Sequence, residues 1–142
     1  MKAIVYGGYG SPDVLKCEEI AKPIPGDEQV LIKVRAASVN PLDYHLMRGR
    51  SYLMRLFVGL RRPKALPGRD VAGEVEAVGR KVRQFKPGDE VYGNCEGAFA
   101  EYALAAESKL ALKPDNVTFE QAASVPVAAF TALQGLRDTG KV

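Results

Sequence analysis

Three polar side chains in one short segment have types that could do chemistry. Asn40 carries an amide, and Tyr44 and His45 follow it closely with side chains that can donate a hydrogen bond or a proton. The spacing could place either ring at a pocket with Asn40 and does not choose between them. Each residue also has a simpler interpretation: Asn40 as a turn or cap residue, Tyr44 as a core residue and His45 as a surface or pocket residue.

The sequence offers few ligands for a metal ion. It holds one histidine and two cysteines, Cys17 and Cys95, which lie far apart and form no C-x-x-C pair. A catalytic zinc site needs about three protein ligands and a structural site usually four. We therefore predict no metal site and two free thiols.

Composition predicts one folded, soluble unit. The chain has 142 residues, of which 46% are hydrophobic, and a net charge of only +3. This balance argues against a nucleic-acid partner, which favours clustered basic residues. No apolar stretch reaches the roughly 18 residues needed to span a bilayer, so we expect no stable membrane insertion and a cytoplasmic location.

Short runs of alternating or β-branched residues recur along the chain and predict strands. They cover residues 2–6, 29–38, 71–78, 90–92, 99–104 and 109–112. Turn signals such as Pro87-Gly88-Asp89 separate several of them, because proline presets φ and glycine permits positive φ. Many short strands with such turns predict a mainly β protein, and a barrel within that class.

Two segments predict helices that would position the polar side chains. Pro41 suits the first position of a helical turn that runs to Arg48, and Asp43 favours its positive end. Near the other terminus, Thr118 and Gln121 can cap an alanine-rich helix that runs to about Leu136. Pro126 should kink or divide this second helix.

Large apolar residues fill the segment 51–60, and arginines flank it at positions 48, 50, 61 and 62. A basic-edged amphipathic segment of this kind can cover an apolar substrate, pack as an ordinary surface helix, or lie on a membrane. We interpret it as an insert that covers a substrate pocket, and the other two interpretations stay open.

Three further patterns carry a resemblance to a known family. The first reads Gly68-Arg69-Asp70, then Gly73, Gly79 and Val82, then Lys86-Pro87-Gly88-Asp89-Glu90-Val91. The second is Ser38-Val39-Asn40-Pro41 with Asp43, and the third runs from Phe119-Glu120-Gln121 through Pro126 to Thr131-Ala132. Together they resemble the zinc-free, quinone-oxidoreductase-like branch of the medium-chain dehydrogenase/reductase superfamily. The match lies in its N-terminal GroES-like, alcohol dehydrogenase-like domain.

The resemblance implies roles for individual residues. Asn40 stands where zinc-dependent members have a cysteine ligand, and it is expected near the nicotinamide and the substrate. Thr131 matches a threonine that faces the nicotinamide, although a threonine within a helix often bonds only a backbone carbonyl. His45 stands where the family has a tyrosine, which leaves the acid role open between Tyr44 and His45. Arg69 and Asp70 can form a local ion pair that shapes the pocket floor, and we expect their role to be structural rather than catalytic. We expect Asp43 to be a helix-start or buried hydrogen-bonding residue rather than a general base.

The resemblance also implies a partly open GroES-like β-barrel with short helices and a C-terminal linking helix. Residues 1–117 would form the catalytic, substrate-binding domain. Residues 118–142 would form the linking helix and the start of a cofactor-binding domain, because the α/β Rossmann domain of the family is absent from this chain.

The expected activity is NADPH-dependent reduction of quinones or α,β-unsaturated carbonyls by hydride transfer without zinc, with NADH as a possible substitute. The absent domain would hold most of the cofactor. This chain alone should be inactive, and the full-length protein should be a homodimer. The alternative is a barrel that works alone in binding or assembly, because a fold does not determine a function.

Overall fold

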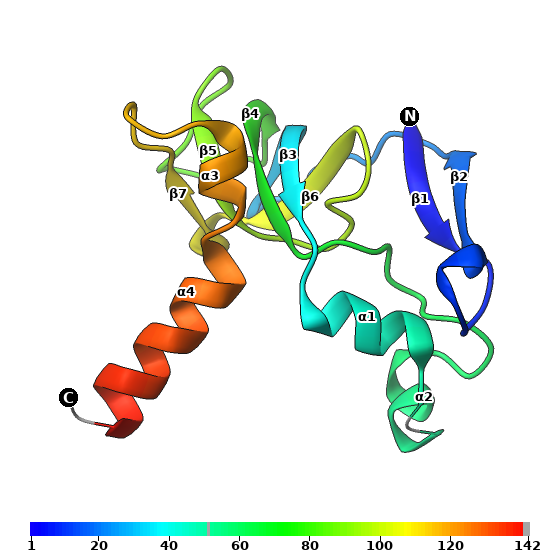
Figure 1. The fold of residues 1–142 in the computed structure, drawn as a ribbon. Coiled ribbons are helices and arrows are strands. Elements are labelled where there is room, and N and C mark those ends of the chain that lie inside the picture. Colours follow the sequence, from blue (N-terminus) through cyan, green and yellow to red (C-terminus); the bar gives the residue numbers. More distant parts are fainter. Residues whose placement is uncertain (51, 141–142) are drawn as a thin grey trace.

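A computed structural model describes residues 1–50 and 52–140, and these residues form a mainly β structure (Figure 1). The strands are β1 Lys2–Tyr6, β2 Leu15–Glu19, β3 Gln29–Ser38, β4 Asp70–Val78, β5 Glu90–Asn94, β6 Tyr102–Ala106 and β7 Leu110–Leu112. The α-helices are α1 Pro41–Arg48, α2 Tyr52–Val58, α3 Phe119–Ala123 and α4 Pro126–Leu133. Single turns form η1 Pro12–Val14 and η2 Glu107–Lys109, and a π-helix, η3 Gln134–Gly140, continues α4.

Five strands form one antiparallel sheet in the order β6-β3-β4-β5-β7. The hairpin of β1 and β2 lies beside it and is joined by backbone bonds, such as Ile4 N–H to the Phe99 carbonyl at 2.8 Å. No ladder among the described strands pairs β7 with β6 or with the hairpin. The predicted partly open barrel is therefore confirmed.

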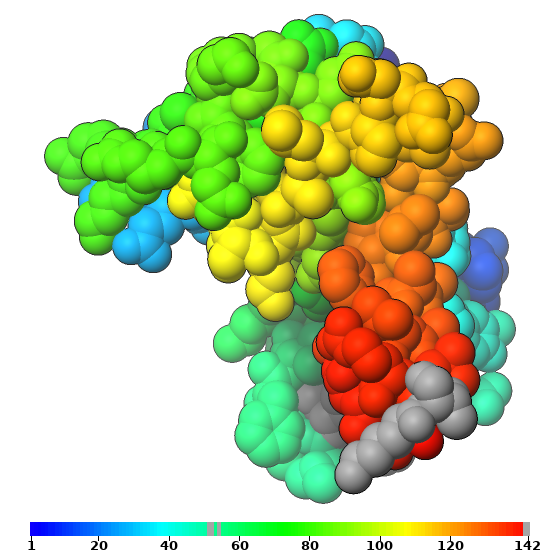
Figure 2. All heavy atoms as spheres, turned by 90° about the vertical axis from the view of Figure 1, so that its left-hand side faces the viewer, coloured from blue at the N-terminus to red at the C-terminus, as the bar shows by residue number. Residues whose placement is uncertain are grey.

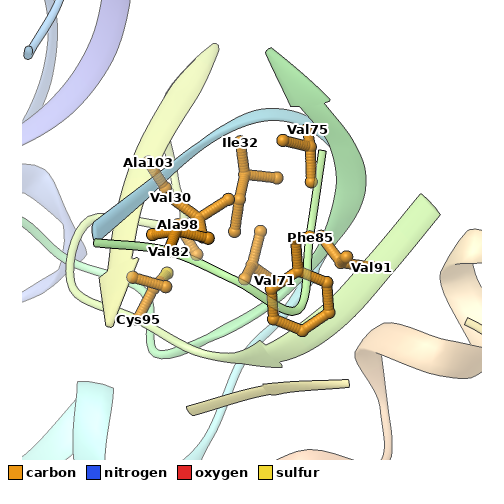
Figure 3. Close-up of a cluster of buried hydrophobic side chains, with 11 residues drawn as sticks. Val30, Ile32, Val71, Val75, Val82, Phe85, Val91, Cys95, Ala98 and Ala103 are labelled. Carbon is orange, nitrogen blue, oxygen red and sulfur yellow. The ribbon is translucent and has the colours of Figure 1, made fainter. Parts of the chain in front are cut away.

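Apolar side chains on the concave side of the sheet form the core (Figure 3). Val30 and Ile32 on β3 point inward with Val71 and Val75 on β4, as the two-residue period of a strand requires. The cluster is completed by Val82, Phe85, Val91, Cys95, Ala98, Ala103 and Ala105.

Two glycines of the family-like motif meet steric demands that only glycine satisfies. A side chain at Gly73 would place its Cβ 2.2 Å from the Lys33 carbonyl oxygen on β3. Gly68 has a φ of +93°, which disfavours other residues, and its Cβ would also meet the Phe99 backbone at 2.7 Å. The spacing of the motif is thus fixed by backbone contacts between neighbouring segments.

The C-terminal helical region is divided as its proline predicts. Thr118 caps α3: its Oγ1 accepts from the Gln121 N–H at 3.2 Å, and the Thr118 N–H donates to Gln121 Oε1 at 2.9 Å. Helix α3 buries Ala122 and Ala123 against Ala72 of the sheet. After Pro126, α4 and η3 extend away from the barrel with most side chains exposed (Figure 1).

Most predicted strands form, with two differences. The run 99–104 was expected to be one strand, but β6 begins only at Tyr102 and continues to Ala106. Strand β2 was not predicted. Its sequence, Leu-Lys-Cys-Glu-Glu, is largely exposed on both faces, so no apolar alternation marks it.

The structure bears on the predictions about the cysteines and about membrane-spanning helices. Cys17 is exposed and Cys95 is buried, and both are free thiols as expected. Within the described ranges, no helix is long and apolar enough to cross a membrane.

Candidate active site

Three polar residues are buried where β3 ends, α1 begins and β4 begins. Asp70 is 0% exposed, Asp43 6% and Asn40 7%. The register of the sheet sets Ser38 of β3 opposite Asp70 of β4, and α1 begins at Pro41, three residues after Ser38. The barrel therefore brings together residues that lie 30 positions apart in the sequence.

Asp70 is the centre of this cluster and accepts hydrogen bonds from three parts of the chain. Asn40 Nδ2 and Ser38 Oγ each lie 3.1 Å from Asp70 Oδ2. The backbone N–H of Val127, in the first turn of α4, lies 3.2 and 3.3 Å from the two carboxylate oxygens. Three donors compensate for burying a carboxylate, which would otherwise be costly.

Asn40 begins α1 and also faces Asp70. Its backbone N–H donates to Asp43 Oδ2 at 2.9 Å in a capping box, which fixes the start of the helix. Its Nδ2 donates to Asp70 and lies 3.3 Å from Ser38 Oγ. The structure therefore places Asn40 at the start of α1, where its backbone N–H binds Asp43, and holds its side-chain amide against Asp70 in one defined orientation.

Asp43 links α1 to the glycine motif. Its second oxygen, Oδ1, accepts from the backbone N–H of Gly68 at 3.2 Å. The carboxylate is thus both a helix-start residue and a buried hydrogen-bond acceptor, as expected. Burial of the Tyr6 phenol, together with the negative charge of nearby Asp43, raises the pKa of Tyr6 to about 12.

The prediction of an ion pair between Arg69 and Asp70 is wrong. Arg69 instead pairs with Glu96 at 2.9 Å. Adjacent residues of an extended segment direct their side chains to opposite sides, so Asp70 enters the buried cluster while Arg69 points the other way.

Tyr44 and His45 lie on α1 with both side chains exposed. Their rings meet edge to face with centroids 5.5 Å apart, and the Arg48 guanidinium lies 5.4 Å from the Tyr44 ring centre. Among the described residues, no hydrogen bond joins either ring to Asn40 or Asp70. An acid role for Tyr44 or His45 stays a prediction.

Thr131 lies one helical turn after Val127 on α4. Its Oγ1 donates to the Val127 carbonyl at 2.7 Å, and the side chain is exposed. Because Asp70 binds the N–H of Val127, the same carboxylate connects Asn40 to the helix that carries Thr131.

Thr131 also lines a cavity of about 390 Å³ between α4 and the edge of the sheet. Its lining also includes Tyr92, Asn94, Ser108, Lys109, Phe130 and Gln134. Figure 2 shows this face, where the orange-to-red C-terminal helix stands beside the yellow segment of η2 and β7.

A second cavity, of about 560 Å³, lies between the N-terminal hairpin and the sheet. Its lining includes Ile20, Leu66, Arg69, Cys95 and Tyr102. Burial raises the pKa of the Cys95 thiol to about 12, so this thiol stays protonated and unreactive near neutral pH.

Two contributors to the site were missed in the sequence. Ser38 was noted only as part of a motif, and the N–H of Val127 carries no side-chain signal at all. The position of Pro126 was the available signal, because a proline at a helix start leaves the next N–H free for a partner.

Residues 26–115, more than half of the chain, match the family model of the alcohol dehydrogenase GroES-like domain. This chain belongs to that family.

The relatives of this chain are named as oxidoreductases. It is 45% identical to the NADPH-dependent alkenal/one oxidoreductase, chloroplastic, of Arabidopsis thaliana, over 96% of the chain and 37% of that protein. It is 42% identical to the quinone oxidoreductase of Sus scrofa, over 96% of the chain and 40% of that protein. The solved quinone oxidoreductase of Coxiella burnetii matches with a TM-score of 0.88 and 36% identity, covering 99% of this chain and 45% of that one.

These similarities confirm the resemblance to the quinone-oxidoreductase-like branch of the medium-chain dehydrogenase/reductase superfamily. The chain spans about 40% of the length of the curated relatives it matches. The strands pair only antiparallel within residues 1–50 and 52–140, so this part of the chain forms no parallel α/β sheet.

Proposed function

We propose that this chain is the substrate-side domain of an NADPH-dependent oxidoreductase that reduces quinones or α,β-unsaturated carbonyls by hydride transfer without zinc. The similarity along nearly the whole chain to enzymes named for these substrates carries the proposal.

The buried cluster supports this function through preorganisation. Hydride transfer requires that the reacting groups be held in a fixed geometry and a water-poor environment. Asp70 orients the Asn40 amide and ties α4 to the barrel through Val127. Asn40 and Thr131 would then flank the reacting groups, with Tyr44 or His45 as the donor to an oxygen that gains charge.

The residues of this chain fit only part of NADPH. When bound, NADPH supplies the hydride. Dinucleotide phosphates bind where a strand, a glycine-rich turn and the start of a helix follow one another. No such succession occurs in the described ranges. We infer that Asn40 and Thr131 contact the nicotinamide end and that a further domain of the intact protein binds the phosphates, with NADH as a possible substitute.

The donor set of the site does not fit zinc. By resemblance, Asn40 takes the place of the cysteine that binds zinc in zinc-dependent members. Its amide nitrogen donates to Asp70, and both oxygens of Asp70 accept from protein donors. Within residues 1–50 and 52–140, no three His, Cys, Asp or Glu side chains gather into a potential metal site. We propose that charge on the substrate oxygen is stabilised by hydrogen-bond donors alone.

We further propose a division into a GroES-like domain over 1–117 and a linking segment over 118–142. The intact protein would be a cytoplasmic homodimer. A barrel that works alone in binding or assembly is the rival interpretation. The bond from Asp70 to the start of α4 favours the enzyme, because it couples the barrel to a helix that projects away from it.

The cofactor contact can be tested by NADPH fluorescence titration of the intact protein that contains this chain. Thr131→Val should raise the Kd for NADPH by about two- to tenfold, the equivalent of one hydrogen bond. Thr139→Val, a matched change of an exposed threonine on η3, should leave the Kd unchanged.

The chain alone should bind NADPH far more weakly than the intact protein. Equal, tight binding by the chain alone would contradict the proposed split of the cofactor site, and no binding by the intact protein would favour the rival.

A further inference from the structure

Positive charge is concentrated in one part of this chain. Residues 44–69 contain seven Lys or Arg and no Asp or Glu. The remaining residues hold 13 Lys or Arg against 17 Asp or Glu, so they are net negative. The whole positive excess of the protein therefore comes from the segment that contains α2.

An exposed apolar stripe lies inside this basic segment. Leu53, Leu56 and Phe57 have the spacing of one helix face and are 68%, 64% and 82% exposed, and Leu60, just after α2, is 68% exposed. Large apolar groups this exposed and this close together mark an interaction site.

The contacts that hold α2 to the rest of the chain do not cover the apolar stripe. The Arg55 Nε donates to the Gly49 carbonyl at 2.7 Å, and its guanidinium lies 4.4 Å from the centre of the Tyr9 ring. The Tyr9 hydroxyl in turn donates to the Gly59 carbonyl. α2 lies beyond α1, below the sheet (Figure 1), and none of its described side chains lines either of the two cavities described above.

Cations flank the stripe in the sequence and have no carboxylate partner among the described residues. Arg50, Arg61, Arg62 and Lys64 are exposed, and none forms an ion pair with a described residue. The Arg62 guanidinium donates a hydrogen bond to the Tyr6 carbonyl, at 3.4 Å.

We propose that this surface, formed by Leu53, Leu56, Phe57 and Leu60 with Arg50, Arg61, Arg62 and Lys64, docks on an anionic lipid bilayer. The apolar stripe would enter the acyl boundary while the cations meet the headgroups. A second copy of the chain is disfavoured because two surfaces of the same charge repel each other. Nucleic acid would use the cations but leave the leucines and Phe57 unexplained.

The test is sedimentation of the chain with vesicles of phosphatidylcholine alone, or with about one third phosphatidylglycerol, at about 0.15 M salt. We expect the chain to bind the anionic vesicles at least tenfold more strongly than the neutral ones. Salt at about 0.5 M should weaken this binding, because it screens the charges.

Two double variants separate the charge from the apolar contribution. Arg61→Gln with Arg62→Gln, and Leu56→Ser with Phe57→Ser, should each reduce binding at least tenfold. The matched controls are Arg80→Gln with Lys81→Gln and Ile24→Ser with Leu112→Ser, which alter exposed residues elsewhere and should bind as the parent does. Circular dichroism checks that each variant is folded.

Several outcomes would overturn the proposal. They are absence of vesicle binding, equal binding to neutral vesicles, and binding that survives both segment variants. Self-association in solution that Phe57→Ser abolishes, without vesicle binding, would assign the stripe to a second copy of the chain. These results leave the proposed reductase function untouched, because the variants keep Asn40, Tyr44, His45 and Thr131, the residues assigned to its chemistry.

Discussion

At the scale of single residues, Asp70 matters most to the geometry of the site. It is fully buried, and its charge is met by donors from Ser38, Asn40 and Val127 rather than by a cation. A buried carboxylate in such a network is stable only while each donor keeps its place.

Replacing Asp70 by asparagine should expose this dependence. The new NH₂ group would face existing donors and leave at least one of them unsatisfied, so Asp70→Asn should lower the free energy of unfolding by about 1 to 3 kcal/mol. Urea denaturation followed by circular dichroism measures the change. Asp115→Asn, at an exposed turn, is the matched control and should change stability little. An unchanged midpoint for Asp70→Asn would mean that the cluster contributes nothing to the fold.

The roles of individual residues were only partly predictable. Asp43 and Asn40 could be placed because proline and acidic or amide residues around a helix start act through local contacts. The partner of Asp70 could not, because it depends on which strands pair and on which side of the sheet each side chain lies. Arg69, next to Asp70 in sequence, was therefore assigned the wrong partner.

At the scale of elements, capping and packing position the C-terminal helices. Thr118 and Gln121 satisfy each other's backbone donors at the start of α3, and α3 then packs Ala122 and Ala123 on the sheet. This fixes where Pro126 starts α4.

Removal of the Thr118 cap should weaken the packing of α3 on the sheet. Thr118→Ala should lower the free energy of unfolding by about 0.5 to 2 kcal/mol, because the Gln121 N–H loses its acceptor. Thr118→Ser keeps a hydroxyl and should retain most of the stability in the same urea titration. Equal losses in the two variants would show that the methyl group, rather than the hydrogen bond, stabilises this helix start.

Elements were most predictable where one face is buried and least where none is. Strand β3 alternates around Val30 and Ile32 and forms over the expected range, 29–38. Strand β2 lies exposed in a hairpin and has no such pattern. The division of the last helix followed from Pro126 alone, whereas its continuation as a π-helix had no signal in the sequence.

At the scale of the whole molecule, the chain is a partly open barrel with two projections: α1 with α2, and α4 with η3 (Figure 1). Asp70 lies where both projections start, since it binds Asn40 at the start of α1 and Val127 at the start of α4. The proposed chemistry requires this arrangement, because the residues assigned to the site lie on the two projections rather than in the barrel.

The most direct test of the reductase proposal is the rate of NADPH oxidation by the intact protein that contains this chain, after treatment with a metal chelator. We predict oxidation that depends on an added quinone or enone and that the chelator does not reduce. The same rate with and without these acceptors, or activity that is lost on chelation and restored by zinc, would contradict the proposal.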